Sequence, residues 1–108
     1  KLLVAQFDIY LNSDESTRDR TPYLLDVQAD LLADLATRVV IPLRAGSDEE
    51  PWAISRLHPV IVLEKQPYLA VVSELAAVPG SILGRKVGDA RRYRTEILAA
   101  IDLLITGF

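Results

Sequence analysis

Few residues of this chain carry the chemistry of an enzyme active site. His58 is its single histidine, and histidine is the side chain that titrates nearest neutrality. It stands beside Pro59 at the start of an expected strand, where a structural or surface role is more common than a catalytic one. The chain has no cysteine, which excludes disulfides and thiolate metal sites. Nucleophile-elbow and phosphate-loop motifs do not occur either. We therefore expect no catalytic residue, no metal site and no cofactor.

Two charged clusters remain as candidate sites. The basic run Arg91–Arg94 could bind an anion or an acidic partner, or it could simply pair with Asp89 and Glu96. Three adjacent carboxylates occur in Asp48–Glu50, but adjacent side chains diverge and the spacing of a calcium loop is missing. The net charge of −3 argues against a protein that coats phosphate backbones, because such domains are usually basic. We expect no direct nucleic-acid binding by the chain alone.

The elements that would position these residues are mostly short strands. Alternation over residues 5–11 places Phe7 and Ile9 on one face and Asp8 and Tyr10 on the other. This period of two predicts a half-buried strand with its polar face in solvent. The polar run that follows, residues 12–22, is predicted to be an exposed loop.

The next segments follow the same pattern. Tyr23–Ala29 is predicted to be a strand, with Asp26, Gln28 and Asp30 on a solvated outer face. Residues 30–36 form either one helical turn or a wide loop. A third strand, rich in β-branched residues, is expected over 38–43 and is closed by Pro42.

Later segments are shorter. Val60–Leu63 and Tyr68–Val72 are predicted to pair as a β-hairpin around the turn 64–67. The segment Trp52–Leu57 holds the single tryptophan, which we expect to act as a lid on the core. A short strand is expected over Ser81–Gly84, and residues 85–88 lead into a final helix.

The final helix, residues 89–108, is the longest expected element. Ile97, Ile101, Leu104 and Phe108 recur on one helical face, and further apolar residues widen that face. A helix apolar over most of its circumference is usually covered on two sides, by a deep core or by a second copy of the chain. Gly107 suits a C-terminal stop, after which the last residue either folds back or is presented to a partner.

Together these elements predict one domain over residues 1–108. Strands first and a helix last indicate a mainly-β or α+β fold, a small barrel or curled sheet of antiparallel strands with a C-terminal α-helix. The apolar fraction of 50% is enough for a core, and nothing approaches the ~18 consecutive apolar residues of a membrane span. Residues 1–4 are too short for a signal peptide. The chain has no methionine, so the initiator residue is absent from this numbering. Residues 1–4 are therefore either native or, in part, a remnant added to the protein.

The order of several short motifs resembles the CcdB family of toxins, from plasmid and chromosomal toxin–antitoxin modules. Each motif is weak alone, but together they span almost the whole chain with a slightly longer first loop. The matching stretches are Gln6-Phe7, Asp26–Asp30, Val40–Leu43, Leu57–Val60, Ala76–Pro79, Ser81–Gly84, Ile101–Leu103 and Gly107.

The resemblance implies a small SH3-like barrel shared with the MazF/Kid ribonuclease toxins, a homodimer and a cytoplasmic location. It implies a plasmid-maintenance toxin that is not an enzyme: a topoisomerase poison that binds the DNA gyrase A subunit and traps gyrase on cleaved DNA. A cognate CcdA-like antitoxin, disordered in part when free, would neutralise it. Neither a cofactor nor a membrane is implied.

The resemblance also implies site residues by position. The gyrase contacts are an apolar pair after the second strand and the end of the helix: Leu31, Leu32, Asp102, Ile105, Thr106, Gly107 and Phe108. The dimer interface is expected at Ile101, Leu104 and Ile105.

Three positions depart from the family pattern, in which Trp stands at Thr106, Asn at Asp102 and Ile at Phe108. Two alternatives therefore stay open. The first is a protein of this fold that no longer poisons gyrase and serves only as an antitoxin or regulatory partner. The second is a ribonuclease toxin on the same fold, which needs a general acid and base and basic RNA contacts. His58 and Arg91–Arg94 would have to supply these groups.

Overall fold

The computed structural model describes residues 5–45 and 52–107. Seven strands, two α-helices and four short 3-10 turns make up this part of the chain. Their order is β1 (Asp8–Asn12), β2 (Tyr23–Asp26), η1 (Asp30–Leu32), β3 (Thr37–Ala45), α1 (Trp52–Leu57), β4 (Val60–Leu63), β5 (Gln66–Ala70), η2 (Val72–Glu74), β6 (Ala76–Pro79), η3 (Gly80–Ile82), β7 (Leu83–Asp89), η4 (Arg91–Tyr93) and α2 (Arg94–Thr106).

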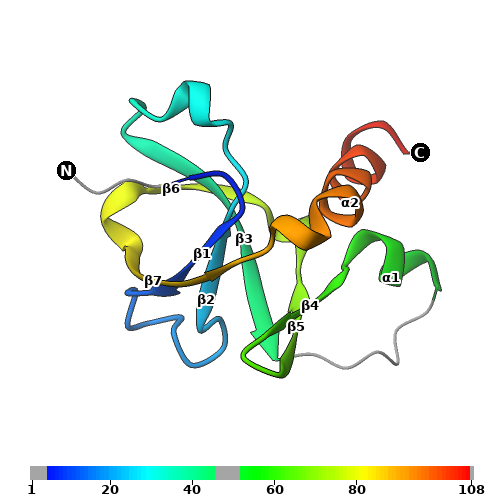
Figure 1. Cartoon of the computed structure of the whole chain (residues 1–108), viewed down its shortest axis with the longest axis horizontal. Coiled ribbons are helices and arrows are strands. Elements are labelled where there is room, and N and C mark those ends of the chain that lie inside the picture. The colour runs from blue at the N-terminus through cyan, green and yellow to red at the C-terminus, as the bar shows by residue number, and fades with distance from the viewer. Residues whose placement is uncertain (1–4, 46–51, 108) are drawn as a thin grey trace.

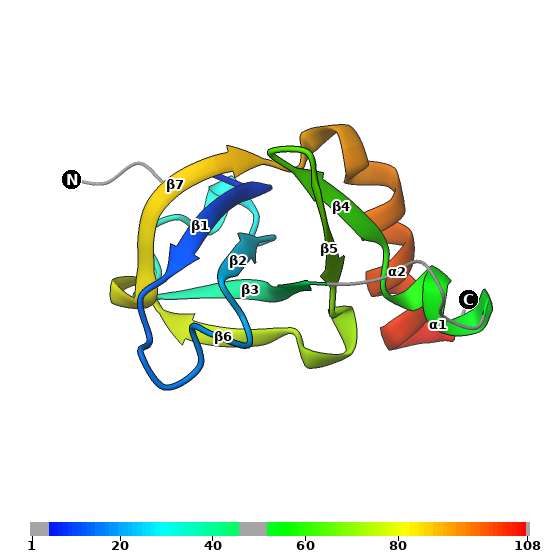
Figure 2. The same ribbon diagram turned by 90° about the horizontal axis from the view of Figure 1, so that it is seen from below.

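All strand pairs are antiparallel, in the order β4-β5-β3-β2-β1-β7. The long strand β3 is shared, because β6 pairs with its first half and β5 with its second half. The sheet therefore curls into a half-barrel, closed on one side by the β6–β7 arm and covered near β4 and β5 by α2 (Figures 1 and 2). This confirms the predicted fold class.

The main core lies between one face of the sheet and α2. Ile9, Leu25 and Ile41 are fully buried, and Ile97 and Ala100 of the helix pack into the same cluster. The alternation of strand side chains places these residues on one face. Burying branched apolar side chains at about 25 cal/mol per Å² of apolar surface is the main stabilising term for a domain of this size.

The opposite face of the sheet is also buried, which corrects the prediction for the first strand. Tyr10 packs in a second cluster with Leu24, Val40 and Leu83, and Asp8 is buried against β7. The strand was expected to show its polar face to solvent. That face is covered because the β6–β7 arm returns over it, and this arm lies more than sixty residues further along the chain.

The predicted acidic outer row on the second strand is likewise wrong for two of its members. Asp26 and Gln28 are both buried. Asp26 pairs with Arg38 of β3, while the side chain of Gln28 accepts the backbone N–H of Val39 and donates to the carbonyl of Leu32. Buried polar groups need such partners, and the partners come from a neighbouring strand and a loop. Asp30 is exposed, as predicted.

The predicted hairpin is confirmed as β4 and β5, whose register pairs Leu63 with Gln66. The two turn residues, Glu64 and Lys65, have φ values of 51° and 67°. Positive φ at both central residues is the hallmark of the tight turns that match strand twist. Of the two alternatives left open for residues 30–36, a helical turn or a wide loop, the structure shows a short 3-10 turn, η1, over Asp30–Leu32.

Three boundaries differ from the sequence prediction. β3 continues past Pro42 to Ala45, and the carbonyl of Pro42 accepts the N–H of Val71. Residues 83–89 form a full strand, β7, held by pairing with β1 rather than by an apolar pattern of their own. Residues 52–57 form the short helix α1, which packs against α2. The acidic run 48–50 lies outside the described residues, as does the side chain of Trp52.

Candidate partner-binding site

Helix α2 is the element that positions the main candidate site. It begins at Arg94, later than the expected residue 89, because the turn η4 comes first and the carboxylate of Asp89 accepts the N–H of Arg91 at 3.0 Å. Ile97 and Ala100 anchor the first half of the helix in the core. The second half extends away from the sheet beside α1 (Figure 1).

The C-terminal end of α2 has a defined backbone. Gly107 adopts the left-handed conformation at φ 80°, and its N–H donates to the carbonyl of Leu103 at 3.0 Å. The hydroxyl of Thr106 donates to the carbonyl of Asp102 at 2.7 Å. These bonds satisfy carbonyls that a helix end leaves free, so the predicted glycine stop is confirmed. Phe108 lies outside the described residues.

The outer face of this helix end is apolar and uncovered. Ile105 is 72% exposed and Leu104 is 40% exposed, whereas Ile101 is half-buried and packs against the core. Asp102 and Thr106 are exposed beside them. Of the two explanations offered for the apolar helix, a deep core accounts for one side only. The other side, with Leu104 and Ile105, is exposed in the single chain.

A second apolar surface lies on the loop around η1, and we call it the leucine loop. It presents Leu31, which is 93% exposed, together with Leu32 and Leu35. The loop backbone is tied down because the side chain of Gln28 donates to the carbonyl of Leu32 at 2.8 Å and Asp30 accepts the N–H of Gln6 at 2.8 Å. Three apolar side chains are thus held in solvent by a fixed backbone.

The leucine loop and the end of α2 project from the same edge of the molecule but lie apart on it (Figure 1). The structure therefore places the predicted residues Leu31 and Leu32 in one exposed surface, and Asp102, Ile105, Thr106 and Gly107 in another. Leu35 was missed by sequence reasoning. Its position four residues after Leu31, in a short segment between two strands, was the available signal.

The residues with possible chemical activity are bound into other contacts. His58 shares a hydrogen bond with the Ser73 hydroxyl, at 2.8 Å between Nε2 and Oγ. Arg92 lies over the ring of Tyr93, 5.1 Å from its centroid. Among the described residues no group of three or more His, Cys, Asp or Glu side chains could hold a metal ion.

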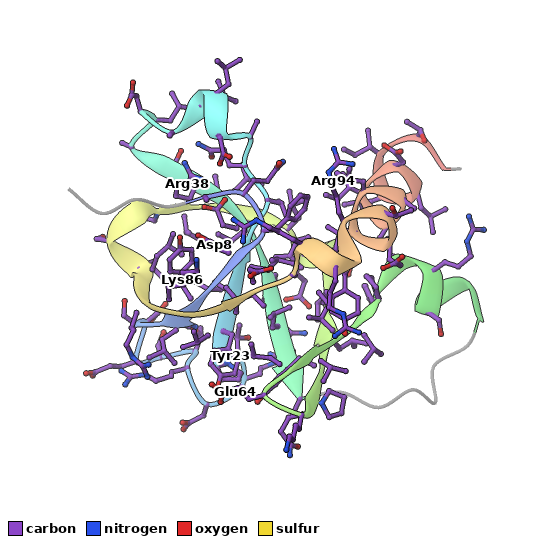
Figure 3. The ribbon with its side chains drawn as sticks, in the orientation of Figure 1. Asp8, Tyr23, Arg38, Glu64, Lys86 and Arg94 are labelled. Atoms are coloured by element: carbon purple, nitrogen blue, oxygen red, sulfur yellow. The ribbon has the colours of Figure 1, made fainter. Side chains whose placement is uncertain are left out.

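Arg91 belongs to a cluster of ion pairs around the buried carboxylate of Asp8 rather than to an open anion site. Its guanidinium lies 3.0 Å from a carboxylate oxygen of Asp8 and 3.4 Å from one of Asp89, and Lys86 approaches Asp8 at 3.3 Å. Asp8 and Lys86 are seen together between β1 and β7 in Figure 3. Sequence analysis offered the pairing of Arg91 with Asp89, which is present, but it missed Asp8, because that residue reads as a solvent-facing strand residue.

Burial shifts the pKa of two groups in this part of the sheet. Burial, with the negative charge of Asp8 beside it, raises the pKa of Tyr10 to about 12. The Tyr10 hydroxyl donates to Asp8 at 3.2 Å. Burial also raises the pKa of the Asp26 carboxyl, although the hydrogen bond from Arg38 acts in the opposite direction. Both shifts follow from placing acidic groups in a poorly solvated interior.

The antiparallel half-barrel with one long C-terminal helix defines a class of small toxin folds. Mycobacterium tuberculosis toxin MazF-mt6 is similar in structure, with a TM-score of 0.70 and 15% identity over 90% of this chain and 94% of that one. An endoribonuclease from Mycobacterial species, solved in complex with its cognate antitoxin, has a TM-score of 0.74 and 11% identity over 95% of each chain. At these identities the likeness concerns the fold.

The sequence itself gives the narrower assignment. Residues 6–107 match the model of the family described as CcdB protein. Since this match covers nearly the whole sequence, the chain belongs to the CcdB family of toxins, as its motifs predicted. In the described part of the chain, no helix has the length and apolar character needed to cross a membrane.

Proposed function

We propose that this protein is the toxin of a type II toxin–antitoxin module that binds the DNA gyrase A subunit and traps gyrase on cleaved DNA. The observation that carries the proposal is the exposed apolar end of α2 in a chain of the CcdB family. Ile105 and Leu104 offer an uncovered apolar surface next to a helix end fixed by Gly107. Apolar side chains on a rigid element are typical anchors of protein interfaces.

The leucine loop supplies the second part of the proposed gyrase surface. Leu31 is almost fully exposed and Leu32 is about half exposed, and Leu35 extends the same surface. Exposed apolar groups held by a tied backbone lose little conformational freedom when a partner binds. Exposed leucines on an ordered backbone are therefore better explained by a loop that binds a partner than by a surface loop without a binding role.

Three residues of the proposed surface differ from the family pattern. Thr106 stands where the family has Trp, and its hydroxyl is turned back onto the helix carbonyl of Asp102. Loss of an interface Trp commonly costs ~2 kcal/mol or more of binding free energy. We therefore place the binding energy of this member on Ile105 and the leucine loop, with Phe108 as a further apolar contact.

A homodimer and an antitoxin complete the proposal. In a symmetric dimer, Ile101, Leu104 and Ile105 of two copies would face one another and bring the two helix ends together. The structurally similar endoribonuclease was solved with its cognate antitoxin, which supports the same kind of partner for this chain. In this proposal the protein acts by binding, without catalysis.

A ribonuclease toxin is the second candidate, because two similar folds are described as endoribonucleases. The residues that sequence analysis offered for it fit poorly. Arg91 is engaged by Asp8 and Asp89, and the net charge of −3 is unfavourable for RNA. A protein that has kept the fold but no longer binds gyrase is the third candidate, and the departure at Thr106 is its basis.

One binding experiment separates the three candidates. The purified protein is titrated with the gyrase A subunit of its own host by calorimetry, and in parallel it is incubated with single-stranded RNA. We expect gyrase binding without RNA cleavage. RNA cleavage would favour the ribonuclease, and neither activity would favour the gyrase-inactive protein.

Two substitutions locate the surface in that experiment. Ile105→Asp and Leu31→Asp should each weaken gyrase binding at least about tenfold, because each puts a charge into an apolar contact. Val62→Asp is the matched control, since Val62 is 48% exposed on β4 and lies outside both proposed surfaces. If Val62→Asp weakens binding as much as Ile105→Asp, the proposed surface is wrong.

A further inference from the structure

The turn that leads into β1 lies between the two exposed apolar surfaces of the molecule. It comprises Ala5–Asp8 and is closed by a hydrogen bond from the N–H of Asp8 to the carbonyl of Ala5 at 3.0 Å. In Figure 1 the blue segment that enters β1 passes between the leucine loop and the start of α2. We call this segment the entry turn. The function proposed above assigns it no role.

Phe7, the third residue of the entry turn, has an unfavourable backbone conformation. Its φ is 71°, in the left-handed region that glycine or asparagine usually occupies in a turn and that a bulky side chain rarely adopts. Its ring is buried in the main core together with Ala90 and Ile97. Such strain persists only where the surrounding structure holds it, and it is most common at functional sites. The contacts that hold the entry turn therefore indicate what the turn does.

One set of contacts joins the entry turn to the leucine loop. The N–H of Gln6 donates to the carboxylate of Asp30, the first residue of η1, at 2.8 Å. The side chain of Gln6 donates to the carbonyl of Val27 at 3.2 Å, and the N–H of Phe7 donates to the carbonyl of Asp26 at 2.6 Å. The end of β2 and the leucine loop thus hold the entry turn from one side, and the turn in return fixes the start of the loop.

A second set of contacts joins the entry turn to the start of α2. The N–H of Ala90 donates to the carbonyl of Phe7 at 2.7 Å, and the guanidinium of Arg91 lies 3.0 Å from the buried carboxylate of Asp8. Lys86 approaches the same carboxylate at 3.3 Å, so the charge of Asp8 stays compensated when Arg91 is replaced. Because α2 follows directly after η4 as one continuous helix, these contacts also help to fix the direction of its exposed end.

We propose that the entry turn is a positioning element that holds the leucine loop and α2 in one fixed arrangement, with Phe7 as its strained centre. A strained turn that is held from two sides relaxes when either side releases it. Loss of the Arg91 contact lets the φ of Phe7 return to the favoured negative range, which moves the N–H of Gln6 away from Asp30. Loosening the start of α2 therefore loosens the leucine loop.

This arrangement deepens the gyrase-binding function proposed above and rests on it. A partner that contacts both the leucine loop and the end of α2 binds more tightly when the spacing of the two surfaces is fixed before binding. Phe7 and Asp8 need not touch the partner to contribute. They are positioning residues, which act through the loop and the helix that they connect.

Residue-resolved hydrogen exchange of the full chain tests the connection without any partner. Three N–H groups report on the leucine loop because they donate to carbonyls of the same segment: those of Leu32, Ala33 and Leu35. Arg91→Gln removes one contact to Asp8. Arg92→Gln is the matched control, since it makes the same charge change on the same turn, at a side chain that stacks on Tyr93 instead.

Two further variants set the scale of the effect. Asp30→Ala removes the acceptor of the Gln6 N–H and so cuts the connection directly. Asp34→Ala removes the same charge from an exposed position of the same loop. The protection factors of the three reporter N–H groups are compared among all four variants and the unsubstituted protein.

We expect Arg91→Gln and Asp30→Ala each to lower the three protection factors at least about threefold, and both controls to leave them within about twofold. If Arg91→Gln lowers protection only in η4 and the first turn of α2, the entry turn does not connect the two surfaces and the proposal is overturned. An equal effect of Arg92→Gln would also overturn it, because the loss of a positive charge alone would then be the cause.

A pair of variants at Phe7 tests the strain. Phe7→Gly and Phe7→Ala both remove the ring from the core, but only glycine adopts a φ of 71° without strain. Glycine is ordinarily the less stabilising of the two, because it gives the unfolded chain more freedom. Here we expect Phe7→Gly to unfold at a higher urea concentration than Phe7→Ala. An alanine variant at least as stable as the glycine variant would overturn the proposal, because Phe7 would then store no strain.

Gyrase binding by the same variants separates the positioning role from the proposed function. We expect Arg91→Gln and Asp30→Ala to weaken binding of the gyrase A subunit at least about threefold, with both controls within about twofold of the unsubstituted protein. Unchanged binding by Arg91→Gln, in spite of a loosened leucine loop, would overturn the positioning role. If the unsubstituted protein does not bind gyrase, the proposed function fails, and the exchange data alone decide whether the entry turn holds the two surfaces together.

Discussion

Asp26 and Arg38 form an ion pair between β2 and β3 that solvent does not reach. The guanidinium of Arg38 contacts one carboxylate oxygen at 2.6 and 2.9 Å, and the backbone N–H of Gln28 donates to the other oxygen at 2.9 Å. Both side chains are almost fully buried. Such a pair adds little net stability, but the loss of one partner is costly because a charge is left in the interior.

Arg38→Met should therefore lower the unfolding free energy by about 3 to 5 kcal/mol at neutral pH, measured by urea denaturation. The loss should shrink in acid. Burial raises the pKa of Asp26, and without Arg38 it rises further. Between the unfolded and the folded pKa of Asp26, the folded state of the variant then holds more protons than the unfolded state, so its stability increases as the pH falls.

The double variant Asp26→Asn with Arg38→Met should recover part of the loss. No recovery would mean that Arg38 stabilises the fold by packing alone.

Tyr10 should lower the stability of the fold at alkaline pH. Its pKa is raised to about 12 in the folded state by burial and by Asp8, while an unfolded tyrosine titrates near 10. Between these values the folded state holds a proton that the unfolded state has lost, so the unfolding free energy falls as the pH rises. The full effect is about 3 kcal/mol.

Tyr10→Phe should remove most of this alkaline loss. At about pH 8 it should cost only about 1 kcal/mol, the typical contribution of the hydrogen bond from Tyr10 to Asp8. Urea denaturation of both proteins at about pH 8 and pH 11 measures the difference. Parallel stability curves across this pH range would show that Tyr10 is not the responsible group.

At the scale of elements, the end of α2 depends on the backbone conformation of Gly107. A Cβ atom at this position would meet nothing within 4 Å, so that only the positive φ of 80° opposes substitution. Gly107→Ala should therefore lower the unfolding free energy by about 1 kcal/mol, measured by thermal unfolding.

Gly80→Ala is the matched control for Gly107→Ala. Its nearest contact would be the carbonyl of Ala36 at 3.7 Å, and its φ is not positive. The substitution should be neutral or slightly stabilising, because it reduces the entropy of the unfolded chain. If both alanine variants lose the same stability, the conformation of Gly107 is not the cause.

Sequence reasoning found elements whose signals are local. The β4–β5 hairpin was found because its two apolar runs and its turn lie within thirteen residues, and the end of α2 because Gly107 marks it. It missed α1, which has only six residues and no capping signal. It also assigned residues 85–88 of β7 to a loop. These residues form a strand because they pair with β1, and their own sequence pattern does not indicate one.

The candidate site was predictable only in part, because contacts between segments far apart in the chain leave no local signal in the sequence. Leu31, Leu32 and the end of α2 were identified by resemblance to a family, and they are exposed as a binding role requires. Their partner stays a prediction. The ion pairs around Asp8 were not predictable, because Lys86 and Arg91 reach Asp8 only when β7 pairs with β1.

At the scale of the whole molecule, the uncovered side of α2 leads to a prediction about assembly. Leu104→Glu should shift a dimer towards monomer, because two buried like charges would face each other across the two-fold axis. Sedimentation velocity at matched concentrations measures the change. Leu35→Glu is the control, since Leu35 is an exposed apolar residue of the leucine loop. A protein that sediments as a monomer without any substitution would contradict the dimer.

The gyrase–DNA cleavage assay tests the central claim most directly. The purified protein, a chain ending at Thr106 and the Ile105→Asp variant are each incubated with supercoiled DNA and the gyrase of the protein's own host. The proposed mechanism predicts that the intact protein accumulates cleaved DNA, and that both altered proteins, folded as judged by circular dichroism, accumulate far less. If the intact, folded protein leaves gyrase turnover unchanged and yields no cleaved DNA, this chain is not a gyrase poison, and its proposed role would be limited to partnership with an antitoxin.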